Sequence, residues 1–225
     1  MSYQIAIFDL DGTILDTLED LKESLNAALA SEGLPPRTLE QTRAFVGNGI
    51  QNLIARAVPD GTAPEKTARV YDAFNRHYAV HCQDHTRPYA GIPEALLQLR
   101  QAGVRTAVVS NKSDYAVQTL CGACFPGQFD AALGWREGLR KKPAPDSVLA
   151  VLQECGIAPS EAVYIGDSDV DIETARNAGL ACIAVNWGFR PRALLEQVGA
   201  QTIVSDVPAL LRAILREEGR VPLER

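Results

Sequence analysis

Two aspartates stand one residue apart where a short apolar run ends. The stretch "AIFDLDGTILDT" at residues 6–17 places Asp9 and Asp11 after apolar residues and before a Gly-Thr turn. Residues i and i+2 of an extended segment point to the same side, so both carboxylates can face one site. Like charges held this close repel, and one of them takes up a proton unless a cation or a reaction uses both. The pair therefore predicts a cation site or a reactive site.

Further polar residues stand at the ends of later apolar runs. Ser110 lies at the end of "RTAVVSN", Asp167 ends "AVYIGD", and Asp171 follows about one helical turn later. The carboxyl ends of parallel strands form one edge of a sheet, and open α/β sheets bind ligands at that edge. We therefore expect these residues to converge with the first two aspartates on one rim.

Four carboxylates at one rim require compensating positive charge, because removing unpaired ions from water costs several kcal/mol each. Mg²⁺ meets this requirement, since it binds carboxylates and water molecules beside phosphate groups. Lys142 in "KKPAPD" supplies a further cation. A magnesium ion, a lysine, a hydroxyl group and a glycine turn together predict a phosphate-binding site.

The elements that position these residues are typical of an α/β protein. Apolar runs rich in Val, Ile and Ala alternate with helical patterns, as expected for strands buried on both faces of a parallel sheet. The expected strands are 4–9, 105–111, 162–167, 181–186 and 202–206. These runs predict a doubly wound, Rossmann-like parallel sheet.

The segment between the first two expected strands is too long for an ordinary crossover. Its first part, "TLEDLKESLNAALASEG", places apolar residues on one helical face, with Thr17 as a candidate N-cap and Gly33 as a stop. Helical patterns continue in "GIQNLIARAV" and "PEKTARVYDAFNRHYAVHC", and "RPYAGIPEAL" is interpreted as the return hinge. We predict an all-helical cap domain at 17–85, inserted into a core domain formed by 1–16 and 86–225.

Composition limits the classes of partner. The chain has 225 residues, of which 46% are hydrophobic and 22% charged, as in proteins that fold in water. A net charge of -6 and a pI near 5.1 argue against binding to nucleic acid or to an anionic membrane surface. No run approaches the roughly 20 apolar residues of a membrane span, and "MSYQIAIFDLDG" lacks signal-peptide features. We expect a cytoplasmic monomer or homodimer.

Two further patterns carry weaker hypotheses. Cys121-Gly-Ala-Cys124 has the spacing of redox and zinc motifs, but the chain has no second such pair. His77, His81 and His85 follow at four-residue spacing and could form a metal-binding stripe. Incidental burial of reduced thiols and a solvated cap helix are the favoured interpretations.

The motifs, taken in order, resemble the haloacid dehalogenase superfamily. They are Asp9-Leu10-Asp11-Gly12-Thr13, Ser110 in "VVSNK", Lys142 in "KKPAPD", and Asp167 with Asp171 in "GDSDVD". The resemblance covers nearly the whole chain and includes a helical cap between the first and second motifs. It implies an Mg²⁺-dependent phosphatase that acts on a small phosphorylated metabolite.

The resemblance also implies roles for individual residues. Asp9 would attack phosphorus and form an aspartyl-phosphate, and Asp11 would serve as general acid and then as general base. Mg²⁺ would be held by Asp9, by the backbone carbonyl of Asp11 and by Asp167, with Asp171 in support. The groups that grip phosphoryl oxygens would be Ser110 and Lys142, with Gly12, Thr13 and Asn111 as further phosphate-binding candidates. Roles in a turn are the alternative for Gly12 and Thr13, a strand-end cap for Ser110, and a helix-dipole interaction for Asp171.

The cap is expected to select the substrate. "FVGNGIQNLIARAV" resembles the cap segment of phosphoglycolate phosphatases, where a Gly-Asn-Gly turn opens a helix that could hold a carboxylate. The candidates are Asn48, Gly49 and Arg56, with Arg43 nearby, and a plain glycine loop between two helices is the alternative. The stretch "ALGWREGLRKKP" departs from that branch, so Trp135 and Arg136 could reshape the pocket, whereas Lys141 is interpreted as a solvated neighbour.

Three classes of function stay open on the sequence. The first is a phosphatase with 2-phosphoglycolate as the leading substrate, or with pyrophosphate or a sugar phosphate in its place. The second is a sugar phosphomutase similar to β-phosphoglucomutase, which would share Asp9 and Asp11. The third is a phosphate-responsive binding module without turnover, which is disfavoured because the chain retains every catalytic motif.

Overall fold

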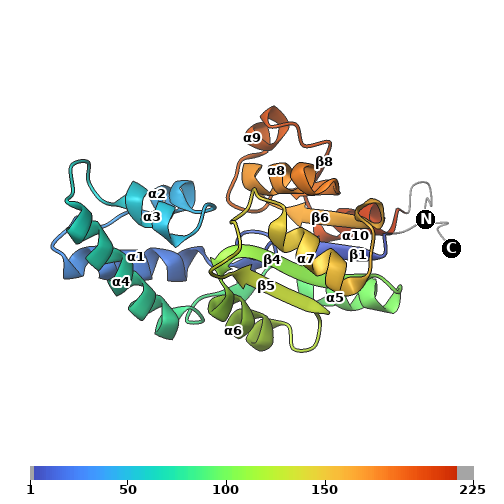
Figure 1. Ribbon diagram of the computed structural model, residues 1–225, viewed down its shortest axis with the longest axis horizontal. Helices are drawn as coiled ribbons and strands as arrows, with labels where there is room; N and C mark the ends of the chain where they lie inside the picture. Colours follow the sequence, from blue (N-terminus) through green and yellow to red (C-terminus); the bar gives the residue numbers. More distant parts are fainter. Residues whose placement is uncertain (1–2, 217–225) are drawn as a thin grey trace.

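The computed structural model describes residues 3–216, in which a parallel sheet forms the centre (Figure 1). Its strands, in spatial order, are β5 (Ala131–Trp135), β4 (Arg105–Ser113), β1 (Ile5–Phe8), β6 (Ala162–Gly166), β7 (Ala181–Val185) and β8 (Thr202–Val204). Each neighbouring pair is parallel. This order, with β1 in the middle, confirms the predicted doubly wound α/β sheet.

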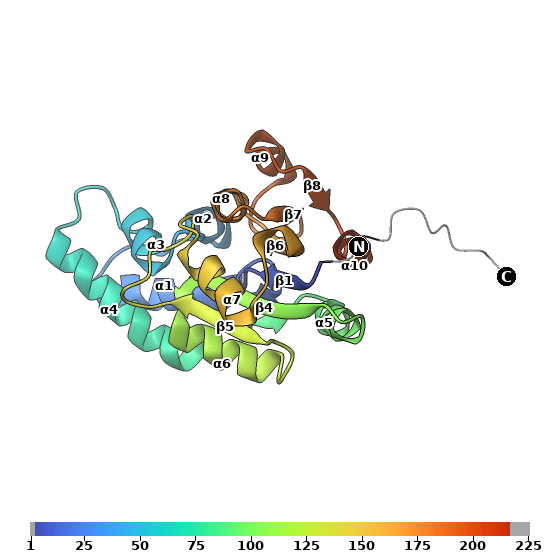
Figure 2. The same ribbon diagram turned by 45° about the vertical axis from the view of Figure 1, so that its right-hand side comes forward.

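The central strand is buried on both faces of the sheet. Ala6 and Phe8 of β1 belong to one hydrophobic cluster, and Ile5 and Ile7 belong to another on the opposite face. The first cluster includes residues of α5 (Ile92–Gln101), α6 (Asp114–Cys124) and α10 (Val207–Leu215). The second includes residues of α7 (Asp146–Cys155) and α8 (Asp169–Ala178), while α9 (Arg192–Gln197) packs beyond β7. Helices therefore cover both faces of the sheet (Figure 2), and the sequence of β1 shows no polar alternation because neither face is exposed.

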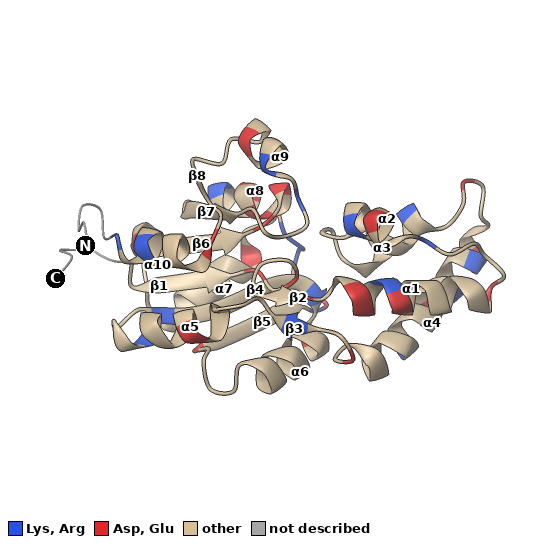
Figure 3. Ribbon diagram, turned by 180° about the vertical axis from the view of Figure 1, so that it is seen from behind, with Lys and Arg blue, Asp and Glu red and all other residues tan. Residues whose placement is uncertain are grey.

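The helices inserted after β1 form a separate bundle beside the sheet (Figure 1). We call them the cap helices; they are α1 (Leu18–Ser31), α2 (Leu39–Phe45), α3 (Ile50–Ala57) and α4 (Pro64–His81). Two short antiparallel strands, β2 (Leu15–Asp16) and β3 (Arg87–Pro88), lie where the chain enters and leaves this bundle (Figure 3). The inserted helical segment is thus confirmed, whereas the domain limits at residues 16/17 and 85/86 stay a prediction.

Several elements differ from the expectations drawn from the sequence. The sheet contains β5, which was not expected, and α2 begins at Leu39 behind a capping box made by Thr38 and Gln41. Thr17 occupies the N-cap position of α1, but its side chain makes no capping bond, and Asp16 accepts the Leu18 amide instead at 3.3 Å. The expected return hinge is partly helical, because Gly91 starts α5 in the left-handed conformation.

Two smaller features complete the fold. A short 3-10 helix, η1 (Pro159–Glu161), leads into β6. Among residues 3–216, the helices are all too short or too polar to cross a membrane.

Candidate active site

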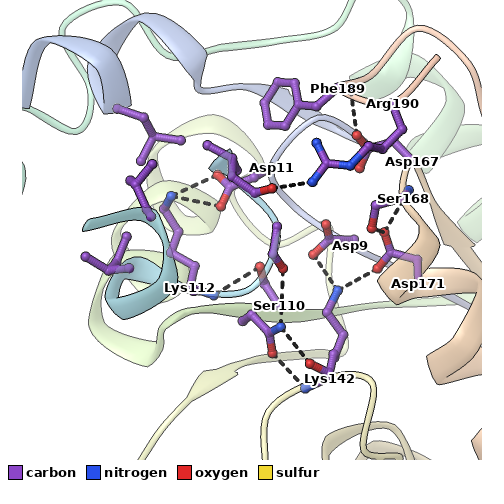
Figure 4. Close-up of a pocket in the computed structure, with 17 residues that line it drawn as sticks. Asp9, Asp11, Ser110, Lys112, Lys142, Asp167, Ser168, Asp171, Phe189 and Arg190 are labelled. Carbon is purple, nitrogen blue, oxygen red and sulfur yellow. Dashed lines mark hydrogen bonds and ion pairs between the residues drawn. The ribbon is translucent and has the colours of Figure 1, made fainter. Parts of the chain in front are cut away.

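A small cavity lies at the carboxyl edge of the sheet, where the cap helices close over it. Its volume is about 40 Å³, which leaves room for a few water molecules. The core side of its wall carries the predicted carboxylates, Ser110 and Lys142 (Figure 4). The cap side is apolar or glycine, and it consists of Leu21, Val46, Gly47, Gly49, Ile50 and Leu53.

Asp9 leaves the end of β1 and faces Lys142, whose Nζ lies 2.8 Å from Asp9 Oδ1. This ion pair is the one contact that Asp9 Oδ1 makes with a cation or donor among the described residues. Burial raises the pKa of Asp9 to about 6, with Lys142 acting against that rise and the Asp171 and Asp11 carboxylates adding to it. An oxygen in this state suits a cation or an electrophile.

Lys142 bridges two carboxylates inside the core. Its Nζ donates to Asp171 Oδ1 at 2.7 Å and to the Tyr164 hydroxyl at 2.8 Å. Burial disfavours the ammonium, but the carboxylates of Asp171 and Asp9 outweigh it and raise the pKa of Lys142. The other oxygen of Asp171 accepts from the Ser168 amide and hydroxyl at 3.1 and 2.6 Å. Asp171 therefore fixes the lysine as well as facing Asp9.

Asp167 directly follows β6, and two hydrogen bonds hold its carboxylate. Its Oδ2 accepts the Phe189 amide at 2.6 Å, and its Oδ1 accepts the Thr13 hydroxyl at 3.2 Å. A Cβ on Gly12 or Gly188 would lie closer than 3.0 Å to this carboxylate. Burial and the neighbouring carboxylates raise the pKa of Asp167. The two glycines make room for a carboxylate that is fixed in place.

These carboxylates fit a divalent cation. Carboxylate oxygens of Asp9, Asp167 and Asp171 lie within 4.8 Å of one another, and all three residues are buried. Burial drives the pKa of Asp9 and Asp167 upward, which is the electrostatic cost that a cation would remove. A hard ion with oxygen ligands matches this donor set, and Mg²⁺ is such an ion.

Asp11 forms an ion pair with Lys112, for which the sequence motifs predict no role. Lys112 Nζ lies 2.8 and 3.0 Å from the two oxygens of Asp11. It also lies 4.7 Å from the ring centre of Tyr78 on α4, so the pair joins the core to a cap helix. Burial opposes the charge of Lys112, but the Asp11 carboxylate raises its pKa above the usual range.

A signal for Lys112 was present in the sequence. Ser110 and Lys112 are i and i+2 in β4, the same spacing that unites Asp9 and Asp11. The pairing of β4 with β5 shifts register between Val109 and Ser113, as at bulges that redirect side chains. Ser110 lines the cavity, and its hydroxyl accepts the Lys112 amide at 3.4 Å.

The phosphate-binding candidates divide into two groups. Asn111 lines the cavity and clamps the backbone of Lys142, accepting its amide at 2.7 Å and donating to its carbonyl at 3.0 Å. Gly12 and Thr13 lie behind Asp167 rather than on the cavity wall. The structure therefore gives those two a role in placing a carboxylate.

The cap candidates are also separated. Gly49 lines the cavity, but Asn48, Arg43 and Arg56 line an outer groove beyond the cap turn. Arg56 donates to the carbonyl of Phe45 at 3.0 Å. Neither arginine reaches the carboxylates, because both belong to the outward side of the cap.

Besides Lys142, the segment that departs from related sequences reaches the rim of the site through Lys141. Lys141 stacks over Trp135, 4.4 Å from the ring centre, and approaches Gln51 of α3 at 3.4 Å. The interpretation of Lys141 as a solvated neighbour is therefore wrong. Arg136 lines a separate groove beside α6 and α7 and has no part in the cavity.

The histidines do not form one stripe, because α4 ends at His81 and His85 lies beyond it. His77 faces the Ser24 hydroxyl at 3.0 Å, His81 faces Asp84 at 2.7 Å and His85 faces Asp20 at 3.0 Å. Both oxygens of Asp20 already accept backbone amides of the return segment. These contacts give the histidines structural partners.

The five cysteines are free. Burial raises the pKa of Cys121 to about 12 and also raises the pKa of Cys124. Because the thiolate is the reactive form, these shifts oppose a redox role for this pair.

Comparison with known proteins agrees with this geometry. A family model described as "Haloacid dehalogenase-like hydrolase" matches residues 6–185. The phosphoglycolate phosphatase of Pseudomonas putida is 31% identical over 218 residues, which span 92% of this chain and 78% of that protein. The phosphoglycolate phosphatase of Agrobacterium fabrum is 33% identical over 217 residues, which span 95% of this chain and 93% of that protein.

Solved structures show the same similarity. A crystal structure of a proposed phosphoglycolate phosphatase from Lactobacillus delbrueckii subsp. bulgaricus has a TM-score of 0.92 at 41% identity, covering 96% of this chain and 99% of that one. CbbY from Rhodobacter sphaeroides, solved in complex with phosphate, has a TM-score of 0.75 at 26% identity, covering 95% of this chain and 99% of that one. The chain belongs to the haloacid dehalogenase-like hydrolase family. It is a phosphoric monoester hydrolase similar to phosphoglycolate phosphatases.

Proposed function

We propose that this protein is an Mg²⁺-dependent phosphatase of a small phosphomonoester, and that 2-phosphoglycolate is its first candidate substrate. The observation that carries the proposal is the cluster of buried carboxylates in which oxygens of Asp9, Asp167 and Asp171 lie within 4.8 Å of one another. These residues line a cavity together with Asp11, Ser110 and Lys142. The cytoplasmic location and the monomeric or homodimeric state stay predictions.

In the first half-reaction, Asp9 attacks phosphorus and the bond from phosphorus to the ester oxygen breaks. Asp11 gives a proton to the departing alkoxide, which leaves as an alcohol. In the second, Asp11 takes a proton from water, whose oxygen attacks phosphorus and releases Asp9 and inorganic phosphate. Lys112 holds Asp11 in position for these proton transfers, since its ammonium contacts both carboxylate oxygens.

Phosphoryl oxygens are held by Lys142 and Ser110, while Asn111 fixes the backbone of the lysine. Magnesium, when bound by Asp9, Asp167 and the Asp11 carbonyl with Asp171 behind them, would neutralise charge that develops on those oxygens. Positioning and charge neutralisation are the main requirements of phosphoryl transfer. The buried cations and carboxylates of this site meet both.

The choice of substrate rests on the relatives and on the wall of the cavity. Curated relatives at about one-third identity are named phosphoglycolate phosphatases. The cap wall is apolar and tight, which favours a small leaving group, and Lys112 is a buried cation on the core side that could face a carboxylate. A sugar phosphomutase is the alternative, but the curated relatives reported above are named as phosphatases.

The test is a panel of phosphate compounds offered to the purified protein with Mg²⁺ or with EDTA. The panel contains 2-phosphoglycolate, sugar phosphates, pyrophosphate and nucleotides, and both phosphate release and isomer formation are measured. The proposal expects release from 2-phosphoglycolate with the highest kcat/KM, and only with Mg²⁺. Isomer formation without release would establish the mutase, and equal release in EDTA would exclude the metal.

A further inference from the structure

One arginine of the core is bonded to the backbone of the cap. Arg190 lies in the segment between β7 and α9, and its Nη1 donates to the Arg43 carbonyl at 3.0 Å. Its Nη2 donates to the Val46 carbonyl, and its Nε lies 3.4 Å from Asp169 Oδ1. All three nitrogens of the guanidinium therefore have partners, and the side chain is only 11% exposed.

The carbonyls that receive Arg190 belong to the C-terminal end of α2, which stops at Phe45. The last carbonyls of a helix lack partners within the helix and carry its negative dipole end, so a cation is favourable there. Gly47 follows in an unusual conformation with φ of 125°, and a Cβ at this position would lie 3.0 Å from Arg190 Nη2. The first glycine of the Gly-Asn-Gly turn is thus fitted to the arginine.

Arg190 also separates two spaces. It lines the inner cavity together with Asp9 and Gly49, and it lines the outer groove together with Arg43 and Asn48. Figure 4 shows Arg190 beside Asp167 and Phe189 at one side of the pocket. A cavity of about 40 Å³ is small for a phosphate ester, so we expect the cap turn to shift when a substrate enters. Movement of residues 46–49 breaks the contacts of Arg190.

Other polar contacts between the core and this turn are longer. Asn111 Nδ2 lies 3.4 Å from the Gly47 carbonyl, and Lys141 Nζ lies 3.4 Å from Gln51 Oε1. Arg190 contributes two hydrogen bonds from one rigid, planar group, and a guanidinium keeps its charge at any working pH. It is the strongest polar contact described between the core and the turn.

We propose that Arg190 is a positioning residue, which fixes residues 46–49 over the carboxylates when the cap is closed and releases them when the substrate enters. The inference rests on the proposed function, because it gives the closed cap a role in phosphate transfer. Arg190 takes no part in bond making. It determines how often the wall of the cavity is in place.

The experiment compares Arg190→Met with Arg192→Met. Arg192 lies two residues away and is paired with Glu196 on the exposed side of α9, so it is a matched control. Hydrogen exchange is measured without ligand, and for Arg190→Met we expect residues 46–57 to exchange at least about fivefold faster, with β1 unchanged. With Mg²⁺ and an aryl phosphate, kcat/KM should fall about tenfold, while Arg192→Met stays close to the parent.

Two more variants keep the test independent of misfolding. Arg190→Lys retains the charge but cannot donate to both carbonyls in the same geometry, so an intermediate rise in exchange is expected. Asp169→Asn weakens the support of Arg190 from the core and should give a smaller rise in the same segment. Exchange of residues 46–57 that is equal in Arg190→Met and Arg192→Met would overturn the proposal, as would parent-like exchange in Arg190→Lys.

The outcomes also separate this inference from the proposed function. Faster exchange in Arg190→Met, combined with a parent protein that releases no phosphate from any substrate, would support the contact and reject the phosphatase. Normal phosphate release by the parent protein, combined with unchanged exchange in Arg190→Met, would support the phosphatase and reject the role of Arg190.

Discussion

Lys142 lies between Asp9 and Asp171, at 2.8 and 2.7 Å, in a region from which solvent is almost excluded. The proposed nucleophile Asp9 must be deprotonated to attack, and its pKa is raised to about 6, mainly by burial and against the opposing effect of Lys142. The positive charge of Lys142 favours the deprotonated form of Asp9. Asp171 and Tyr164 hold the ammonium in that position.

Asp9→Asn tests the nucleophile. The amide keeps the size of the side chain but cannot form an acyl phosphate, so phosphate release should fall by at least about a thousandfold. Steady-state kinetics with the best substrate of the panel measure the loss, and circular dichroism checks the fold. The matched control is Asp72→Asn on the exposed face of α4, which should retain parent activity. Parent-like turnover by Asp9→Asn would rule out the covalent mechanism.

Lys112→Met tests the partner of Asp11. Removing a buried cation leaves the Asp11 carboxylate without its ion pair, which impairs its exchange of protons with the leaving group and with water. We expect kcat to fall about ten- to hundredfold, with a smaller change in KM for an aryl phosphate. Lys66→Met on α4 provides the control. An unchanged kcat in Lys112→Met would assign the lysine a structural role alone.

Residues with a local signal could be predicted, and residues placed by long-range packing could not. Asp9 and Asp11 can be recognised because they are residues i and i+2 at the end of a predicted strand. The same i, i+2 spacing counted from Ser110 predicts Lys112. Arg190 and Phe189 carry no such signal, because their contacts with the cap and with Asp167 join segments far apart in the sequence. Arg56 was expected at the cavity, but helix orientation decides that question, and α3 turns it outward.

At the scale of elements, the segment after β7 supports the cluster of buried carboxylates. It supplies the Phe189 amide to Asp167 and places Gly188 against the same carboxylate. The segment that follows β7 therefore holds in position the carboxylate that follows the neighbouring strand β6. This arrangement depends on the absence of a side chain at residue 188.

Gly188→Ala tests that dependence. A Cβ at this position would lie closer than 3.0 Å to Asp167 and to the Gly12 carbonyl, so the carboxylate must move. We expect a loss of at least about tenfold in activity at limiting Mg²⁺, partly restored by more Mg²⁺. Gly122→Ala in α6 is the control, since its Cβ meets nothing within 4 Å and should slightly stabilise the helix. Equal Mg²⁺ dependence in the two variants would contradict the prediction.

Some elements could not be predicted from the sequence, and each has a physical reason. The strand at 131–135 lies at the edge of the sheet and is mostly half-buried, so "AALGW" lacks the apolar run that marked the central strands. The helix at 39–45 buries Thr42 and depends on a capping box rather than on an apolar face. Gly91 was interpreted as a hinge residue, whereas its left-handed conformation starts a helix.

For the whole molecule, the buried carboxylates predict how stability depends on pH. The native pKa of Asp9, about 6, and that of Asp167 both lie above the ordinary value of 3.8 for an aspartate. A raised pKa stabilises the folded state below the unfolded value and loses that contribution as the pH rises through the native value. Without metal, this contribution should therefore be smaller at pH 7.5 than at pH 5.

Mg²⁺ should reverse the trend, because it binds deprotonated carboxylates and stabilises the folded state by mass action. Thermal unfolding in EDTA and in Mg²⁺ at the two pH values measures the effect, and the rise in Tm should be larger at pH 7.5. Asp9→Asn, which lacks one titrating ligand, should show a smaller rise and a weaker pH dependence. An equal rise at both pH values in the parent would contradict the assignment of these ligands.

The two short strands between the sheet and the cap helices have a further consequence. Leu15 pairs with Pro88 and Asp16 with Arg87, so the chain departs and returns at the same place. Because the two ends of the insertion meet, we expect that the cap can be replaced at this junction while β1 and β4 keep their register. The cap that surrounds the leaving group can therefore change independently of the core. A protein of this kind can acquire new substrates while its catalytic residues stay the same.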